Sequence, residues 1–350
     1  MENNQILVFI PWLIGIIVII VIGYTVFSLV LTHIKGQKGD TLPKEITIML
    51  IGPESVGKTS VLATSYNAVS NNSIVEFDVH PQHDTMRVLS DAYGKLHKVT
   101  EQSFYQDITP LLEGTQIMAE RLFDVFLKDE EYLKLKIWDI PGGYMNISEN
   151  HTEYKKFKKA LTEATVFINV LDAVALIEGD NSYFHERATP QMAQYYLNES
   201  IVKNPDKECV VLFVVTKCEK WLKTEEGRRE LQSKFDSRYS DVINLFNRAS
   251  GKMAGVLIPV KTLGCVEFTR FDFETKRPIF EKKPRTDCTP QFVDQPLRHI
   301  LTFALSQLQI STKEQRKFPE KYGDFQNALG ALQGTRDRNL TIYGRKDLLG

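Results

Sequence analysis

The sequence of 350 residues has little cysteine and almost no net charge. Its 43 Lys and Arg residues balance 44 Asp and Glu residues, which leaves a formal charge of −1. Because proteins that bind nucleic acid through its phosphates usually carry a basic excess, we expect no nucleic-acid partner. The few cysteines lack the paired spacing of a zinc site and are typical of reduced thiols in a cytosolic protein. They are Cys209, Cys218, Cys265 and Cys288.

Charge is also absent from residues 6–31, where the chain is almost wholly apolar. Since roughly 20 apolar residues cross a hydrocarbon core, this run predicts a single transmembrane helix embedded in a lipid bilayer. Glu2 is the only charged residue before the run, whereas His33, Lys35 and Lys38 follow it. The positive-inside rule then leaves the rest of the chain in the cytoplasm. A cleaved signal peptide is the alternative, which the unbroken apolar length disfavours.

The remainder of the chain is long enough for one α/β domain with insertions. We predict a linker at 32–44, the domain at 45–310 with insertions at about 70–112 and 175–205, and a polar tail at 311–350. Such a tail is expected to be solvated and partly disordered, with a weak contact to anionic lipid as the alternative.

Continuous apolar runs alternate with helical stretches along this domain. Such runs are typical of a parallel sheet covered on both faces, and their alternation predicts a doubly wound α/β fold. Two runs, 121–127 and 133–140, are too close for a crossover helix and should form an antiparallel hairpin. The expected strands are 45–51, 121–127, 133–140, 164–171, 208–216 and 255–260; the expected helices are 60–70, 154–161, 191–202, 225–250 (one or a pair) and 295–308, with an inserted helix at 84–99.

Residues 52–59 spell G-x-x-x-x-G-K-T between an expected strand and an expected helix. The glycines let successive backbone N–H groups turn towards phosphates, and the helix adds its positive N-terminal end. The motif predicts a nucleoside triphosphate site in which Lys58 reaches the β- and γ-phosphates and Thr59 binds Mg²⁺. The residues expected to hold the phosphates are Gly52, Glu54, Ser55, Val56, Gly57, Lys58, Thr59 and Ser60.

A phosphate loop followed by one hairpin in an otherwise parallel sheet resembles the Ras-like and Arf-like small GTPases over about 45–308. The resemblance implies a three-layer P-loop NTPase sandwich that binds GTP or GDP with Mg²⁺. Residues 138–143, Trp-Asp-Ile-Pro-Gly-Gly, resemble the switch II element of this family. There Asp139 would hold Mg²⁺ and the Gly142 N–H would sense the γ-phosphate. An ordinary Asp-x-Pro-Gly turn is the alternative.

The same family has a switch I threonine whose hydroxyl binds Mg²⁺ and whose N–H meets the γ-phosphate. Thr115 lies just before the hairpin and 24 positions ahead of Asp139, close to the family spacing. Thr109 is the alternative. Lys58, Thr115 and Gly142 are therefore the candidate catalytic residues.

Two further segments resemble the family's base-binding loops. Thr216-Lys217-Cys218-Glu219 is similar to [NT]-K-x-D, in which the lysine lies over the purine and the carboxylate accepts guanine N1–H and N2–H. Glu219 is one methylene longer than the usual aspartate, and a solvated Lys-x-Glu loop is the alternative. Within 261–264, Thr262 and Leu263 occupy the place of the S-A-K loop, whose N–H contacts guanine O6.

The family's water-positioning glutamine is missing, because Gly143 and Tyr144 follow the switch II glycine. This implies slow intrinsic GTP hydrolysis unless another residue contributes. Such a residue is an arginine supplied by a partner, or Arg87 or Arg121 from the chain itself.

Together these features predict a membrane-anchored GTP-binding switch that acts on a protein effector or partner subunit. The architecture is similar to the β subunit of the signal recognition particle receptor, and equally to membrane-anchored bacterial GTPases of unassigned role. A membrane-tethered ATPase or kinase and a scaffold that binds nucleotide without hydrolysing it are the alternative functions.

Overall fold

The computed structural model divides the chain into two units, Met1–Leu42 and Pro43–Gly350. It describes residues 44–71, 77–107, 112, 114–142, 152–249, 251–308, 319–337 and 339–349. The predicted membrane helix at 6–31 lies outside these residues, as does the linker up to residue 43. Among the helices that the structure does describe, none combines the length and apolar character of a membrane span.

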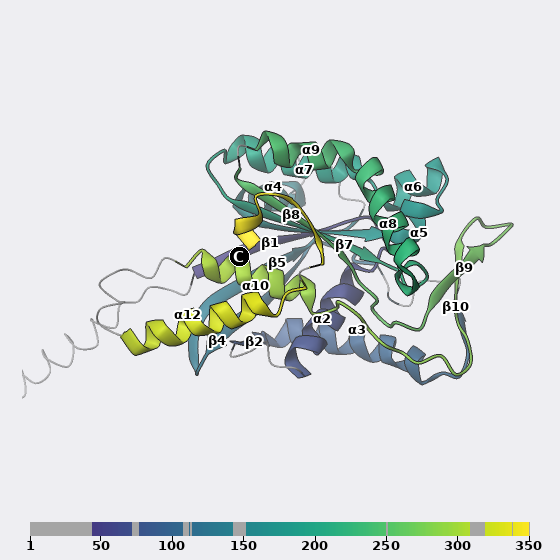
Figure 1. Cartoon of the computed structure of the whole chain (residues 1–350), viewed down its shortest axis with the longest axis horizontal. Coiled ribbons are helices and arrows are strands. Elements are labelled where there is room, and N and C mark those ends of the chain that lie inside the picture. Colours follow the sequence, from purple (N-terminus) through teal and green to yellow (C-terminus); the bar gives the residue numbers. More distant parts are fainter. Residues whose placement is uncertain are drawn as a thin grey trace, which may run out of the picture. The chain divides into compact units, whose positions relative to one another are not determined.

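The centre of the second unit is an eight-stranded sheet in the order β11-β8-β7-β6-β1-β5-β4-β2 (Figure 1). β1 (Lys44–Ile51) pairs in parallel with β5 (Glu130–Asp139) and β6 (Val166–Asp172). The parallel run continues through β7 (Cys209–Thr216) to β8 (Met253–Pro259). Every residue of β6 and β7 is buried, as expected where helices cover both faces of a sheet. The prediction of a mostly parallel α/β sheet is confirmed.

The predicted antiparallel hairpin is also present. β4 (Ala119–Leu127) pairs with β5 across a turn in which Lys128 and Asp129 have φ angles of 49° and 66°. Two positive φ angles are typical of a turn that follows the twist of the flanking strands. β2 (Phe77–Pro81) extends this edge by pairing with β4, and no feature of the sequence predicts it.

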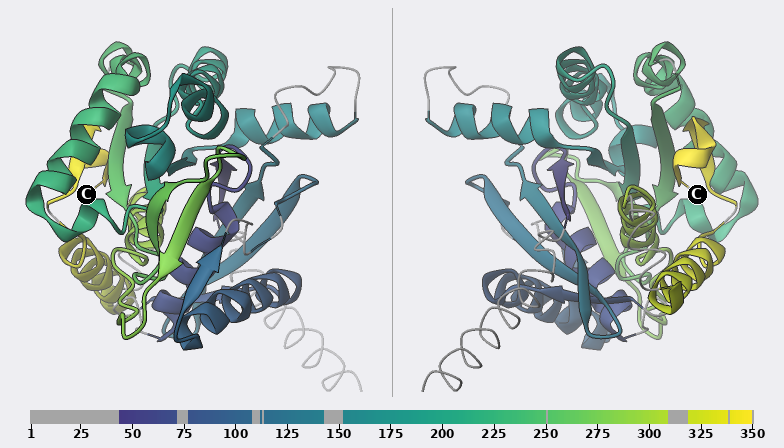
Figure 2. Two further views of the ribbon diagram at one scale, coloured as in Figure 1. Left: turned by 90° about the vertical axis from the view of Figure 1, so that its right-hand side faces the viewer. Right: turned by 90° about the vertical axis from the view of Figure 1, so that its left-hand side faces the viewer.

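The helices lie in two layers, one on each face of the sheet (Figures 1 and 2). Each layer closes its own apolar core, because alternate residues of the strands point to opposite faces. All the expected helices are present, and the segment 225–250 forms a pair. One layer holds α2 (Lys58–Asn71), α3 (His83–Glu101), α10 (Gln295–Ser306) and α12 (Pro319–Gly334); the other holds α4 (Thr152–Glu163), α5 (Ala173–Ile177), α7 (Pro190–Lys203), α8 (Glu225–Arg238) and α9 (Ser240–Arg248).

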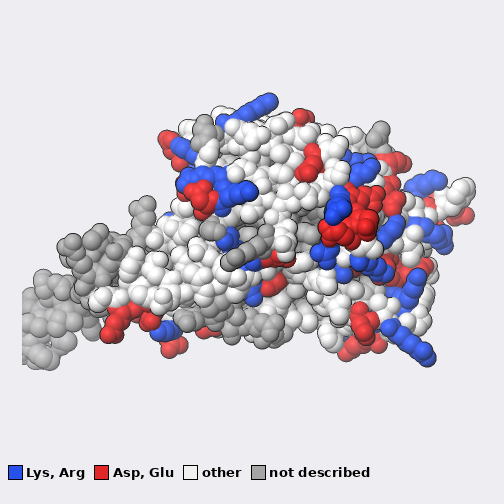
Figure 3. All heavy atoms as spheres, in the orientation of Figure 1, with Lys and Arg blue, Asp and Glu red and all other residues white. Residues whose placement is uncertain are grey.

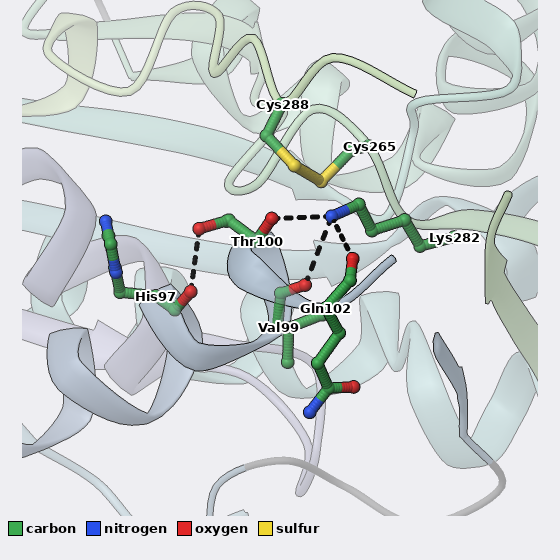
Figure 4. The surroundings of a disulfide bond; sticks show 7 residues. All are labelled: His97, Val99, Thr100, Gln102, Cys265, Lys282 and Cys288. Carbon is green, nitrogen blue, oxygen red and sulfur yellow. Dashed lines mark hydrogen bonds between the residues drawn. A yellow bond between two sulfur atoms is a disulfide. The ribbon is translucent and has the colours of Figure 1, made fainter. Parts of the chain in front are cut away.

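A second, three-stranded sheet combines two strands that follow β8 in the chain with one that precedes β4. Its order is β3 (Tyr105–Asp107), β10 (Pro278–Lys282) and β9 (Glu267–Phe271). Lys282 on β10 connects this sheet to α3, because its ammonium donates to the carbonyls of Thr100 at 2.5 Å and Gln102 at 2.6 Å. These carbonyls lie at the end of α3, where cations are favoured (Figure 4).

The polar surface reflects the near-zero charge of the sequence. On the face drawn in Figure 3, acidic and basic side chains lie next to one another. Ion pairs on the hairpin have the same character: the Lys134 ammonium lies 3.1 Å from Asp124, and that of Lys136 lies 3.2 Å from Glu45. Such partly exposed pairs stabilise a fold only weakly.

The prediction of a solvated tail at 311–350 is wrong for 319–337 and 339–349. Helix α12 buries apolar side chains against the sheet, and β11 (Thr341–Gly344) pairs antiparallel with β8. The short 3₁₀ helix η3 (Lys346–Leu349) then buries its two leucines. Charged and polar residues together outnumber apolar ones in this region, so composition concealed a helix whose buried apolar residues share one face: Phe325, Ala328, Leu329 and Leu332.

The aromatic anchor of α12 gives a test of this correction. Phe325 is fully buried, stacks on Tyr132 at a centroid distance of 5.3 Å and meets the edge of Phe77. Phe325→Ala should lower the free energy of unfolding by about 3–5 kcal/mol, because it opens a cavity in the core. Urea denaturation measures this change. The matched variant Gln326→Ala, at an exposed position of the same helix, should leave the midpoint unchanged; equal midpoints for both variants would contradict the packing described.

Candidate functional site

The loop at residues 52–59 connects β1 to α2 at the carboxyl edge of the sheet. Gly52 has a φ of 143°, and a Cβ there would lie only 2.5 Å from the carbonyl oxygen of Val170 on β6. Ser55 and Gly57 also have positive φ, at 59° and 98°. Residues with positive φ interspersed among ordinary ones turn successive backbone N–H groups to one side, which makes a concavity for an anion. The loop thus has the backbone that a phosphate site requires.

The side chain of Lys58 bends back over this loop. It is 6% exposed, and its ammonium donates to the carbonyl oxygens of Gly52 at 2.8 Å and Pro53 at 2.9 Å. Burial lowers the pKa of Lys58, and the nearby carboxylates of Asp139 and Glu54 oppose that shift. A buried ammonium is costly unless it is paired with an anion, and a bound phosphate at this loop would supply that anion.

The structure brings together two of the three residues predicted to hold a metal, and the third, Thr59, follows Lys58 at the start of α2. The Thr115 hydroxyl donates to Asp139 Oδ2 at 2.9 Å, although 24 positions separate them. Asp139 is 2% exposed, and within the described ranges its Oδ1 has no hydrogen-bond partner. Burial raises the pKa of Asp139, while Lys58, Thr115 and Arg121 act to lower it. A buried carboxylate with an open oxygen, beside a hydroxyl, fits a hard cation such as Mg²⁺. The alternative Thr109 lies outside the described residues.

The backbone of Gly142 packs closely against the phosphate loop. A Cβ at this position would lie 2.3 Å from the backbone nitrogen of Glu54 and 2.7 Å from the carbonyl carbon of Pro53. Only glycine permits this approach, which places the predicted switch II residue in contact with the loop that is expected to hold the phosphates. Gly143 and Tyr144 lie outside the described residues.

The predicted base loop is tied to the phosphate loop through Thr216. Its hydroxyl contacts the carbonyl oxygens of Val56 at 2.5 Å and Leu171 at 3.0 Å. Lys217, which follows with a φ of 56°, pairs with Asp172 Oδ2 at 2.6 Å. The ammonium also lies 5.4 Å from the ring centroid of Phe280 on β10. The lysine is thus held between a carboxylate and an aromatic ring.

Sequence reasoning missed Asp172. It is fully buried at the end of β6, where its Oδ1 caps α5 and its Oδ2 meets Lys217. The available signal in the sequence was an aspartate that closes the apolar run 164–171; only the pairing of β6 with β7 places it beside the base loop.

Glu219 joins the two predicted base loops. It is 4% exposed, and burial raises its pKa from 4.5 to about 7, while its own N–H and that of Gly264 act to lower it. Leu263 packs its side chain with Leu96 and Val99 of α3, and Thr262 beside it is half-buried. The carboxyl group therefore links the end of β7 to the 261–264 loop.

A disulfide joins Cys265, directly after that loop, to Cys288, with 4.5 Å between their Cα atoms (Figure 4). The prediction that all four cysteines are reduced is wrong for this pair. Their 23-residue separation carries no recognisable motif, so only the fold reveals them as neighbours. Cys209 and Cys218 are free and buried.

The arginines near the site differ from those the sequence suggested. Arg87 lies on α3, is largely exposed and faces Asp84 at 3.9 Å. Arg121 lies on β4 and acts on Asp139 through its charge. Arg187, which sequence reasoning did not single out, donates from Nη1 to the carbonyl oxygen of Glu54 in the phosphate loop. No motif surrounds it, since it comes from one of the predicted insertions.

Residues 46–253, more than half of the chain, match the family described as Double-GTPase 2. The chain belongs to the Double-GTPase 2 family. This confirms the GTPase part of the predicted resemblance. The membrane anchor and the similarity to the signal recognition particle receptor stay predictions. No curated protein matches this Double-GTPase 2 chain.

Three solved structures are similar to parts of the Double-GTPase 2 chain. The GTPase-like domain of Ski7 from S. cerevisiae, bound to GTP, is 13% identical with a TM-score of 0.36, over 63% of this chain and 43% of that one. Sup35 complexed with GDP is 11% identical with a TM-score of 0.28, over 63% and 38%. Sar1 from Encephalitozoon cuniculi in complex with GDP is 11% identical with a TM-score of 0.26, over 68% and 75%. The chain spans less than half of the Ski7 and Sup35 structures, and the assignment rests on the family match.

The raised pKa of Glu219 predicts how stability depends on pH. Between pH 4.5 and about 7 the folded protein keeps a proton that the unfolded chain has lost, so stability falls as pH rises through this window. Glu219→Gln removes the ionisable group and keeps an acceptor oxygen for the Gly264 N–H. The free energy of unfolding of the variant should rise relative to that of the wild type by up to about 1.4 kcal/mol per pH unit in this window. Denaturant unfolding at pH 5, 6, 7 and 8 measures the difference, with exposed Glu226→Gln as control; parallel curves for wild type and Glu219→Gln would refute it.

Proposed function

We propose that this Double-GTPase 2 protein binds GTP with Mg²⁺ and acts as a nucleotide-dependent switch with slow intrinsic hydrolysis. The observation that carries the proposal is the 2.9 Å contact between Thr115 and Asp139 beside the buried ammonium of Lys58. These three residues come from segments that are distant in the sequence: the phosphate loop and the two candidate switches. A ligand that carries phosphate together with a metal would use all of these groups.

Each group has a role in this proposal. Lys58 and the N–H groups of residues 54–60 bind the β- and γ-phosphates. Thr59, Thr115 and Asp139 would hold Mg²⁺, which supplies positive charge to the phosphate oxygens when bound. Gly142, in contact with Glu54, reports the γ-phosphate through its N–H. Loss of the γ-phosphate removes the acceptor for that N–H, so the Gly142 segment changes its contacts with the loop.

Guanine is the proposed base. The Lys217 side chain, fixed by Asp172, would cover one face of the purine, and the N–H of Leu263 would meet O6. Glu219 would accept from N1–H and N2–H as a carboxylate, although it is longer than the usual aspartate. Its link to Gly264 supports the proposal because one ligand could then engage both loops.

The apolar run at 6–31 supports a further part of the proposal. As a transmembrane anchor it would hold the GTPase domain at the cytoplasmic side of a membrane, where the nucleotide state would control a protein effector or partner subunit.

Nucleotide selectivity tests the guanine assignment. The purified full-length protein should bind GTP more tightly than ATP, and Glu219→Ala should weaken GTP by about 10- to 100-fold, the effect of losing hydrogen bonds to a charged group. ATP affinity should not change, and Lys58→Met should weaken both nucleotides. Isothermal titration calorimetry measures these affinities. Equal binding of GTP and ATP, unaffected by Glu219→Ala, favours the membrane-tethered ATPase or kinase instead.

The dependence on Mg²⁺ tests the switch. Thr115→Ala should weaken GTP by about 10-fold and raise the Mg²⁺ concentration needed for binding, while GDP affinity stays the same, because this threonine should engage only the triphosphate state. The control is Gln116→Ala, at the exposed residue next to Thr115, which should not change either affinity. A loss of the same size for GTP and GDP would argue against a switch. Nucleotide that co-purifies and never exchanges would point to the scaffold, and turnover of many GTP per second would reject slow hydrolysis.

A further inference from the structure

Arg187 reaches the phosphate loop from a segment outside the expected GTPase motifs. It is the last residue of α6 (Asn181–Arg187), and its Nη1 donates to the carbonyl oxygen of Glu54. Glu54 is also the residue against which Gly142 packs, and it follows Pro53, whose carbonyl holds Lys58. Three groups suited to a γ-phosphate thus converge on two adjacent residues of the loop.

The chain on both sides of Arg187 is firmly held. Before it, the Asp180 side chain caps α6 by accepting the N–H of Tyr183 at 2.8 Å, and the Tyr183 hydroxyl lies 3.4 Å from Asp172. After it, the carbonyl oxygen of Ala188 accepts the hydroxyl of the buried Tyr239. An arginine on a fixed segment loses little freedom when it meets a ligand, which favours a role in binding charge.

The present partners of the guanidinium leave it able to bind phosphate. Its Nη2 lies 2.8 Å from the carboxylate of Glu186, whose side chain is 59% exposed. An exposed ion pair of this kind contributes little, so a phosphate group can replace it. A guanidinium has five N–H donors in a planar fork that matches phosphate oxygens, which the single bond to Glu54 does not exhaust.

We propose that Arg187 is a catalytic arginine, supplied by the chain itself, that contacts the phosphates of bound GTP. The inference rests on the proposed GTPase function. In hydrolysis a water oxygen bonds to the γ-phosphorus while the bond from that phosphorus to the β–γ bridging oxygen breaks. The electron pair stays on GDP, and the water proton leaves with phosphate. Arg187 stabilises the negative charge that gathers on the bridging and γ-oxygens in this step.

Single-turnover hydrolysis by the full-length protein tests the role. Arg187→Gln removes the charge and should slow hydrolysis by about 100-fold or more, a conservative figure for an arginine in this position. Arg187→Lys keeps the charge but not the fork and should be slowed less. GDP affinity should stay near that of the wild type. GDP with aluminium fluoride, which mimics the transferring phosphoryl group, should bind the wild type and not Arg187→Gln. The control is Arg229→Gln, the same change at an exposed site on α8, which should match the wild type.

The outcomes separate this inference from the proposed function. Wild-type protein that binds no GTP would overturn both. GTP binding with equal hydrolysis in wild type and both Arg187 variants would overturn the inference alone. A loss of GDP affinity as large as the loss of rate, in either variant, would mean that Arg187 only supports the loop, and this also overturns it. If Arg187→Gln fails to fold, as thermal denaturation would reveal, the same comparisons with Arg187→Lys decide.

Discussion

Lys58 carries its charge at a position that is only 6% exposed, and the surrounding structure is arranged around that fact. A buried ammonium without partners costs several kcal/mol, so the loop turns the carbonyls of Gly52 and Pro53 towards it. The carboxylate of Asp139 adds opposite charge from the end of β5. β1 leads into the phosphate loop and pairs with β5. This pairing brings Asp139, at the end of β5, close enough to balance the charge of Lys58. The same pairing positions the metal candidates Thr115 and Asp139 and the switch glycine Gly142 beside the phosphate loop.

A second buried charge links the base loop to the insertion. Asp172 ends β6, caps α5, pairs with Lys217 and lies near the hydroxyl of Tyr183 on α6. Asp172 thus connects Lys217, the proposed purine contact, to the helix that ends in Arg187 through side chains as well as through the sheet.

Much of this site could be predicted because its motifs are local. The 52–59 loop, the hairpin and Asp139 are each defined by a few consecutive residues, and the spacing between Thr115 and Asp139 follows from the hairpin between them. Asp172, Arg187 and the disulfide between Cys265 and Cys288 could not be found in this way, because each acquires its meaning from a partner far along the chain. The strands β9 and β10 are five residues each with mixed polarity, which leaves no periodic signal. The terminal elements were hidden by their largely polar composition: α12 buries only four residues, all on one side.

The four residues of β11 also bear on the solubility of the protein. β8 is apolar and almost wholly buried, and one side of it pairs with β7. Without β11 its other side would offer a row of free N–H and C=O groups, a template on which a second chain could add a strand. β11 occupies that row with a short segment that ends at Gly344, whose positive φ turns the chain away. The open edge is thereby reduced to four residues, too few to support a continuous intermolecular sheet.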